Sequence, residues 1–141
     1  MAKTEMRITA SAQDVFDVLA DGWSYAGWVV GASHIREVDE GWPAEGTRIH
    51  HSVGPWPLQV EDVTKVVRVV HGELIELEAR MWPVGSAKVR ITLTPAGPGA
   101  TDAVMEEEIT RGPARVVPDV LLKPRNAEAL RRLADIARGR T

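Results

Sequence analysis

Three stretches in the second half of the sequence alternate apolar with charged or polar residues at a period of two. They cover residues 73–81, 87–94 and 101–109, and an amphipathic segment follows them. A period of two is typical of half-buried antiparallel strands, because successive side chains point to opposite faces of a sheet. The order of these segments predicts a curved antiparallel sheet that closes around one helix, with room between them for a small apolar ligand.

The first half of the sequence supplies further elements for the same sheet. Residues 4–9 alternate as a first strand, and Ser11 with Asp14 has the spacing of a capping box at the start of a helix. We expect this helix to end near Ala20 and a short second helix to follow before residue 31. Three more strands are expected over residues 34–38, 47–53 and 58–70. The predicted fold class is therefore α+β, with a seven-stranded antiparallel sheet.

The last helix is predicted to bury one face. At about 100° per residue, nearly all the apolar residues of this segment fall on one side, while arginine and acidic residues fall on the other. The buried side is expected to contain Leu122, Asn126, Ala129, Leu130, Leu133, Ile136 and Ala137. Asn126 is the polar member of this stripe. Pro124 either begins the regular helix or kinks a longer one that starts near Asp119.

The composition is that of a single globular domain. The 141 residues are 44% hydrophobic, which suits one domain with a core over residues 1–141. The net charge of −3 provides no field that attracts nucleic acid or anionic membrane. The sequence has no cysteine and no apolar run of signal-peptide or membrane-spanning type, so we expect a cytoplasmic protein without disulfides or membrane insertion. It is expected to be a monomer or a homodimer.

Turn positions predict which residues face each other across the strands, since a hairpin fixes the faces of both its strands. A tight reversal at residues 71–72 pairs Val70 with Glu73, and loops are expected at residues 82–86 and 95–100. The outer face then carries a row of opposite charges formed by Glu78, Arg90 and Glu106. The pairs predicted for the inner face are Thr64 with Ala79, Ala79 with Val89, Val89 with Glu107, and Ile91 with Met105.

Polar side chains also fall on the inner face, where they are costly unless they are paired or hydrated. They are His51, Asp62, Thr64 and Glu107 from the strands and Asn126 from the last helix. A ligand cavity accommodates such groups more readily than a dry apolar core does. We therefore interpret these five residues as cavity candidates.

His51 is the first residue of this set with acid–base chemistry. A hairpin with Val53 opposite Leu58 places His51 diagonal to Asp62 on the inner face. Such a pair holds imidazole in one tautomer for proton transfer to a carbonyl substrate, but it equally suits a structural pair or a histidine near a hydrated mouth. Adjacent His50 points to the opposite face, so the two histidines do not chelate one metal, and no metal site is expected.

Glu107 is the second such residue. A carboxylate buried between apolar neighbours has a raised pKa unless a donor lies beside it, so Glu107 is suited to act as a general acid or to bind a ligand hydroxyl. The structural alternatives are a hydrogen bond to Asn126 or capture by Arg125. Four tryptophans are expected either at the pocket entrance or in the core and lid, namely Trp23, Trp28, Trp56 and Trp82.

The order strand, helices, six strands and long helix resembles the START-like helix-grip superfamily (SRPBCC) over nearly the whole chain. Five segments are similar to an actinobacterial branch described as polyketide cyclase/dehydrase and lipid transport proteins. They are Gly54-Pro55-Trp56-Pro57-Leu58, Asp62-x-Thr64, Trp82-Pro83-x-Gly85, Met105-Glu106-Glu107 leading to Gly112-Pro113, and Arg125-Asn126-x-Glu128-x-Leu130. The resemblance implies a helix-grip fold. It supplies no catalytic motif, because the superfamily includes lipid carriers, receptors and cyclases on one scaffold.

Three functions are compatible with these observations. The leading hypothesis is non-covalent binding or carriage of a hydrophobic small molecule, such as a lipid or polyketide-like compound, without a cofactor. The second is a cyclase or dehydratase that uses His51, Asp62 or Glu107 in proton transfer, and the third is a protein-interaction module without a ligand. The predicted ligand-binding residues are His51, Trp56, Asp62, Thr64, Ala79, Met81, Trp82, Val89, Ile91, Met105, Glu107, Asn126 and Leu130. Whether a reaction is catalysed stays open at this point.

Overall fold

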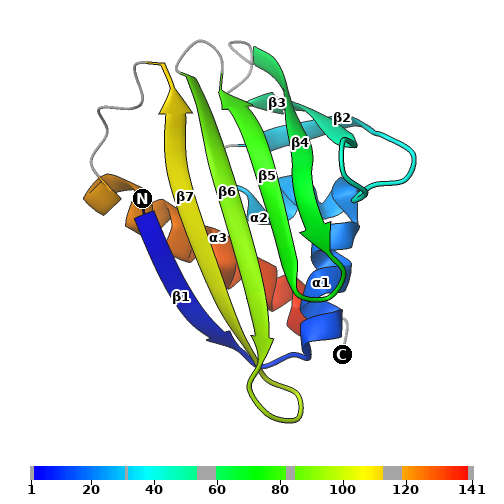
Figure 1. Cartoon of the computed structure of the whole chain (residues 1–141), viewed down its shortest axis with the longest axis vertical. Coiled ribbons are helices and arrows are strands. Elements are labelled where there is room, and N and C mark those ends of the chain that lie inside the picture. The colour runs from blue at the N-terminus through cyan, green and yellow to red at the C-terminus, as the bar shows by residue number, and fades with distance from the viewer. Residues whose placement is uncertain (1, 31, 54–59, 82–84, 113–118, 140–141) are drawn as a thin grey trace.

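Seven antiparallel strands form one curved sheet in the computed structural model (Figure 1). The structure describes residues 2–30, 32–53, 60–81, 85–112 and 119–139. Neighbouring strands follow the order β1-β7-β6-β5-β4-β3-β2. The strands are β1 (Ala2–Ile8), β2 (Ala32–Val38), β3 (Arg48–Val53), β4 (Val60–Val70), β5 (Leu74–Met81), β6 (Gly85–Pro95) and β7 (Thr101–Arg111). The predicted α+β class and seven-stranded sheet are thus confirmed.

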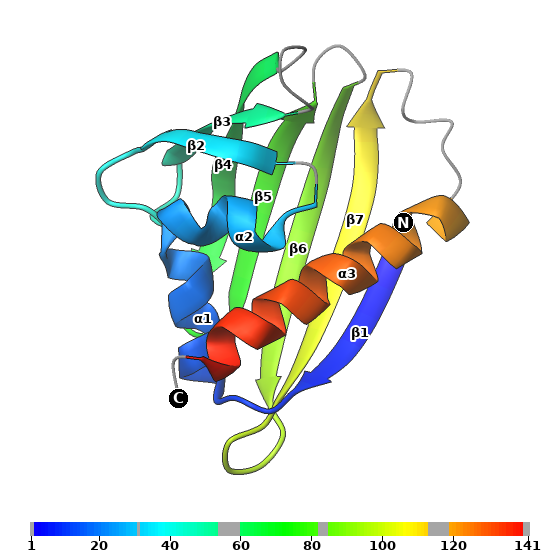
Figure 2. The ribbon, with the colours of Figure 1, turned by 180° about the vertical axis from the view of Figure 1, so that it is seen from behind.

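The helices lie on one face of this sheet. They are α1 (Ala12–Ala20), a 3-10 turn η1 (Gly22–Ser24), α2 (Tyr25–Trp28) and α3 (Asp119–Arg138). Figure 2 shows α3 crossing the sheet diagonally, with α1 and α2 beside its C-terminal half. Close contacts of α3 with β1, α1 and α2 hold it there. This is the helix-grip arrangement, in which a curved sheet closes around a long terminal helix.

The start of α1 forms as its sequence predicts. The Ser11 hydroxyl accepts a 3.1 Å hydrogen bond from the Asp14 N–H, which satisfies a backbone donor that has no partner within the helix. The helix then buries Val15, Phe16, Val18 and Leu19 on one face. Capping and amphipathic spacing therefore act together to set both the start and the orientation of α1.

The last helix is the longer of the two predicted forms, since it begins at Asp119 and contains Pro124. A proline at this position supplies no N–H to the carbonyl of Val120, one turn earlier. The predicted apolar stripe is buried against the sheet and α1, except that Ile136 is half-buried at its margin. Asn126 lies within this stripe and is also buried.

The register of the sheet agrees with prediction at three of the four inner-face pairs. Thr64 opposes Ala79, Val89 opposes Glu107, and Ile91 opposes Met105. The reversal before β5 was predicted wrongly, because Val70 pairs with Leu74 rather than with Glu73. A bulge at Val67 takes up the extra residue and restores the predicted alignment further along the strand.

The pairing of β5 with β6 differs from prediction by two residues. Ala79 opposes Ala87 rather than Val89, because β6 begins at Gly85, within the segment expected to form a loop. On the outer face Arg90 therefore lies between Glu76 and Glu106, and its guanidinium contacts the Glu76 carboxylate at 2.7 Å. A slip of two residues leaves every side chain on its predicted face, since side chains alternate with a period of two.

The pairing of β3 with β4 is shifted in the same way. Val53 pairs with Val60 rather than with Leu58, which itself lies outside the described residues. His51 is therefore directly opposite Asp62 instead of diagonal to it. Both side chains remain on the inner face.

No helix within the described ranges is both long enough and apolar enough to cross a membrane.

Candidate functional site

A cavity of about 90 Å³ lies between the inner face of the sheet and α3. Its walls come from α2 and the residues after it, from β3, β5, β6 and β7, and from the first half of α3. Leu77, Val89 and Glu107 form part of one cross-strand row through β5, β6 and β7. The complete lining is Tyr25, Trp28, Val29, Val30, His51, Leu77, Ala79, Arg80, Val89, Met105, Glu107, Arg125, Asn126 and Ala129.

Six of the residues predicted from the sequence line this cavity. They are His51, Ala79, Val89, Met105, Glu107 and Asn126. Ile91 and Leu130 instead belong to the fully buried core, and neither Thr64 nor Asp62 reaches the cavity surface. Trp56 and Trp82 lie outside the described residues, as does the side chain of Met81. The role of all these residues in binding stays a prediction.

A buried hydrogen-bonded chain links two residues of the cavity lining, Tyr25 and His51, through Thr64. The Tyr25 hydroxyl lies 2.8 Å from Thr64 Oγ1, which in turn lies 2.9 Å from His51 Nε2. The rings of Tyr25 and His51 are stacked with their centres 5.4 Å apart. Burial raises the pKa of Tyr25 to about 12, so its hydroxyl keeps its proton at neutral pH.

The proton positions in this chain follow from the donors that are present. A buried hydroxyl that fails to donate is costly, which favours donation by Tyr25 to Thr64 and by Thr64 to His51 Nε2. The His51 ring then carries its own hydrogen on Nδ1. That atom is buried and has no hydrogen-bond partner among the residues that the structure covers. Burial lowers the pKa of His51, and the Asp62 carboxylate opposes this shift in part, so the neutral ring is favoured.

Glu107 is held by the helix that covers the cavity. Its side chain is 2% exposed, and its Oε2 lies 3.5 Å from Nη1 of Arg125, which is 36% exposed. Capture by Arg125 was one of the two structural alternatives considered for Glu107. The other, a bond to Asn126, is not formed, because Glu107 Oε1 and Asn126 Nδ2 are both buried without a hydrogen-bond partner among the described residues.

Asp62 occupies a similar position on β4. Its Oδ1 accepts a 2.9 Å hydrogen bond from the Val63 N–H and lies 3.4 Å from Nε of Arg80, whose side chain is 57% exposed. Arg80 and Arg125 both reach the cavity lining. Each of these two arginines therefore carries its charge next to a buried carboxylate, Asp62 for Arg80 and Glu107 for Arg125.

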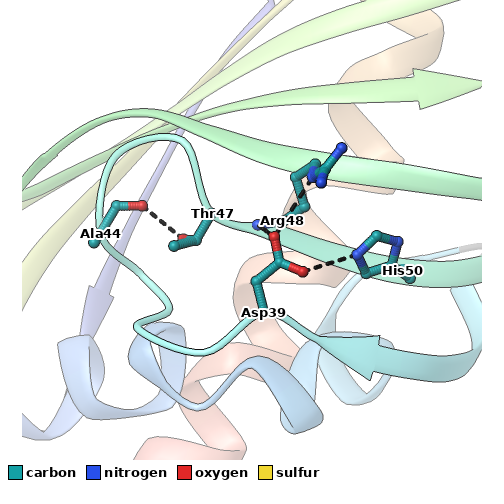
Figure 3. A network of polar contacts seen from close by, with 5 residues as sticks. All are labelled: Asp39, Ala44, Thr47, Arg48 and His50. Atoms are coloured by element: carbon teal, nitrogen blue, oxygen red, sulfur yellow. Dashed lines mark hydrogen bonds and ion pairs between the residues drawn. The ribbon is translucent and has the colours of Figure 1, made fainter.

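His50 belongs to a separate network of polar contacts, which Figure 3 shows, and strand alternation turns its side chain to the face of β3 opposite that of His51. Its Nε2 lies 2.9 Å from Asp39 Oδ1, while Asp39 Oδ2 accepts a 3.0 Å hydrogen bond from the Arg48 N–H. The contact with His50 is the largest cause that lowers the pKa of Asp39. Within the described part of the chain, no group of three or more His, Asp or Glu side chains is arranged to hold a metal ion.

Two of the four tryptophans lie outside the described residues, and the other two differ from each other. Trp28 is buried and lines the cavity, whereas Trp23 is 61% exposed and does not.

Seven lining residues were missed by sequence reasoning, namely Tyr25, Val29, Val30, Leu77, Arg80, Arg125 and Ala129. The apolar, glycine-rich segment 21–31 carried a signal for three of them, since it was too apolar for a solvated loop.

Comparison with known proteins identifies relatives by family and by fold. Residues 1–138 match the model of a family described as polyketide cyclase/dehydrase and lipid transport. No curated protein matches the chain at a significant level. The ZhuI aromatase/cyclase from Streptomyces sp. R1128 has a similar structure, with 15% identity, a TM-score of 0.75, and coverage of 99% of this chain and 93% of that chain. A START superfamily protein from Mycobacterium smegmatis is 18% identical with a TM-score of 0.64, covering 99% and 94% of the two chains.

Proposed function

The chain belongs to the polyketide cyclase/dehydrase and lipid transport family, and on that premise we propose that it binds and carries a hydrophobic small molecule between the sheet and α3. The observation that carries this proposal is the cavity itself. Its wall combines apolar side chains from five strands and helices with a few buried polar atoms, which is the usual composition of a small-molecule site.

The volume of the cavity limits what it holds without movement. About 90 Å³ is below the roughly 300–1,000 Å³ of typical ligand sites and below the roughly 150 Å³ of an engineered core cavity that admits benzene. A single-ring ligand needs a modest widening, and a multi-ring ligand needs a larger one. Arg80 and Arg125 are the lining residues best placed to yield, since both have long side chains that are partly exposed.

A cyclase or dehydratase activity is the second candidate, and one observation favours it. His51 Nδ1 and Glu107 Oε1 both lack a partner among the described residues, and both belong to residues that line the same cavity. A neutral imidazole and a carboxylate facing one substrate are suited to general acid–base catalysis. An interaction module with a filled interior is less well supported, since the interior contains this cavity.

Native mass spectrometry of the freshly purified chain tests the binding proposal. We expect a bound small molecule that is lost on denaturation, and we expect Ala79→Leu, which fills the cavity, to purify without it. Glu78→Leu is the matched control, because Glu78 is the exposed neighbour of Ala79 on the outer face of β5. The proposal would be contradicted if the purified chain contained no ligand and also bound none of the apolar compounds added to it.

A further inference from the structure

Two residues of the cavity lining carry buried polar atoms that have no hydrogen-bond partner in the described part of the chain. Glu107 Oε1 and Asn126 Nδ2 are buried, belong to residues that line the same cavity, and have no hydrogen-bond partner among the residues that the structure describes. Glu107 is only 2% exposed and Asn126 only 3% exposed, so bulk water does not readily supply the missing hydrogen bonds. Buried polar atoms without partners are rare in folded proteins, because each costs the full desolvation penalty of the group.

The chemistry of these two atoms restricts what satisfies both. The Asn126 Nδ2 group is a donor and requires an acceptor, while an ionised Glu107 is an acceptor and requires a donor. A hydroxyl group meets both demands with one oxygen, since it accepts through a lone pair and donates its hydrogen. A carboxylate donates nothing, and a hydrocarbon does neither.

The charges around the cavity also disfavour an anionic ligand. The two arginines of the lining each face a carboxylate, since Arg125 contacts Glu107 and Arg80 contacts Asp62. An anionic head group therefore finds no unpaired cation at these positions, and an ionised Glu107 has no hydrogen to donate to it. Rejection of this kind is a source of specificity that is independent of the attractive contacts.

Resting on the proposed function, we infer that Glu107 and Asn126 form a polar subsite that selects a neutral, hydroxyl-bearing apolar ligand over an anionic one such as a fatty acid. His51 lines the same cavity, and its Nδ1 has no partner among the described residues, so in the tautomer assigned above this atom is a further donor for a second oxygen of the ligand. The cavity is small, so an occupant lies close to this subsite rather than in a remote part of a large chamber.

Three single-ring probes of similar size separate the contribution of a hydroxyl group to binding from that of a negative charge. Phenol and toluene have nearly the same shape and differ in the hydroxyl, while benzoate carries the negative charge. Dissociation constants are measured by titrating the isotopically labelled full chain and following its amide resonances. We expect phenol to bind at least about tenfold more tightly than toluene, because the unpaired buried groups penalise a ligand that cannot satisfy them. Benzoate is expected to bind most weakly.

Two substitutions assign the selection to named residues. Asn126→Leu is similar in size and is expected to reduce the preference for phenol over toluene to less than about threefold. Glu107→Gln keeps an acceptor oxygen but removes the charge, so phenol binding is retained while benzoate gains at least about tenfold. Arg131→Leu, at an exposed position of the same helix, is the control and is expected to leave all three constants unchanged.

The outcomes distinguish this inference from the proposed function. If toluene binds in the cavity as tightly as phenol, or benzoate binds more tightly than phenol, the subsite inference is wrong and the binding proposal stands. If none of the three probes binds, both are overturned. The wild-type ratios decide the question even where Asn126→Leu does not fold.

Discussion

Arg125 on α3 contacts Glu107 on β7 through an Nη1–Oε2 distance of 3.5 Å, and this contact joins the covering helix to the inner face of the sheet. The carboxylate is buried while the guanidinium remains partly exposed. Opening the cavity near this end of α3 therefore involves separating the pair. Glu107, a polar residue of the cavity wall, therefore lies beside the partly exposed side chain of Arg125.

Packing of α3 against the sheet is expected to supply much of the stability of the fold. Leu130 is fully buried on the helix face that covers the sheet, so Leu130→Ala is predicted to lower the free energy of unfolding by about 2–5 kcal/mol. Urea denaturation followed by circular dichroism measures the change. Val120→Ala is the control, because Val120 is 68% exposed in the same helix and its truncation should cost less than about 0.5 kcal/mol. Equal effects of the two substitutions would refute the assigned packing.

The cap of α1 is predicted to contribute separately. Ser11→Ala removes the acceptor for the Asp14 N–H and should lower the free energy of unfolding by about 1 kcal/mol. Ser11→Asp retains a capping oxygen and should restore most of that loss. Chemical denaturation of the three proteins tests this, and an alanine variant as stable as the wild type would show that the cap is dispensable.

The hydrogen-bonded chain from Tyr25 through Thr64 to His51 predicts the tautomer of the buried histidine. Donation along this chain leaves the ring hydrogen on Nδ1, which nitrogen NMR of the imidazole detects directly. Tyr25→Phe removes the first donor and allows Thr64 to accept from His51, so we expect the ring to shift toward the Nε2–H form. A wild-type ring already protonated on Nε2 would contradict the assigned direction of the chain.

Burial of His51 also predicts a dependence of stability on pH. Because the folded-state pKa is lowered, the unfolded chain binds more protons than the folded chain between the two pKa values. The contribution of His51 is thus fully present above the unfolded value of about 6.5 and is lost as pH falls toward the folded value. The slope is at most about 1.4 kcal/mol per pH unit.

His51→Gln is expected to remove this part of the slope in urea denaturation series between neutral and mildly acidic pH. His34→Gln, at an exposed position of β2, is the control and should leave the slope as it is in the wild type. The prediction fails if the wild type and His51→Gln lose stability in parallel as the pH falls.

Alternation in the sequence predicted the faces of the strands except at the end of β4, where the bulge at Val67 reverses the faces of the residues that follow, and it did not predict every pairing. The predicted opposition of Val89 and Glu107 is observed, whereas Ala79 pairs with Ala87 because the loop before β6 is shorter than expected. Loop length sets register, and a change of two residues keeps all faces while shifting the partners. The extra residue at Val67 had no signal, since a bulge depends on pairing with the next strand.

The cavity wall was predictable where it is made of strands. Glu107 and His51 stood out because a period-two pattern exposes any polar residue on an apolar face. Tyr25 did not, because it belongs to a short irregular helical segment whose orientation is set by tertiary contacts such as its bond to Thr64. Arg80 and Arg125 were not among the predicted binding residues, because alternation on β5 and the helical period of α3 turn them away from the apolar faces, although long side chains from such positions reach the cavity edge.

The most direct test of the central claim is a titration of the isotopically labelled chain with toluene, which probes the cavity irrespective of polar recognition. We predict saturable shifts of amide resonances that are centred on Ala79, Val89 and Ala129, and their loss in Ala79→Leu but not in Glu78→Leu. Shifts that never saturate, or that centre instead on exposed residues such as Trp23, would contradict a ligand cavity between the sheet and α3.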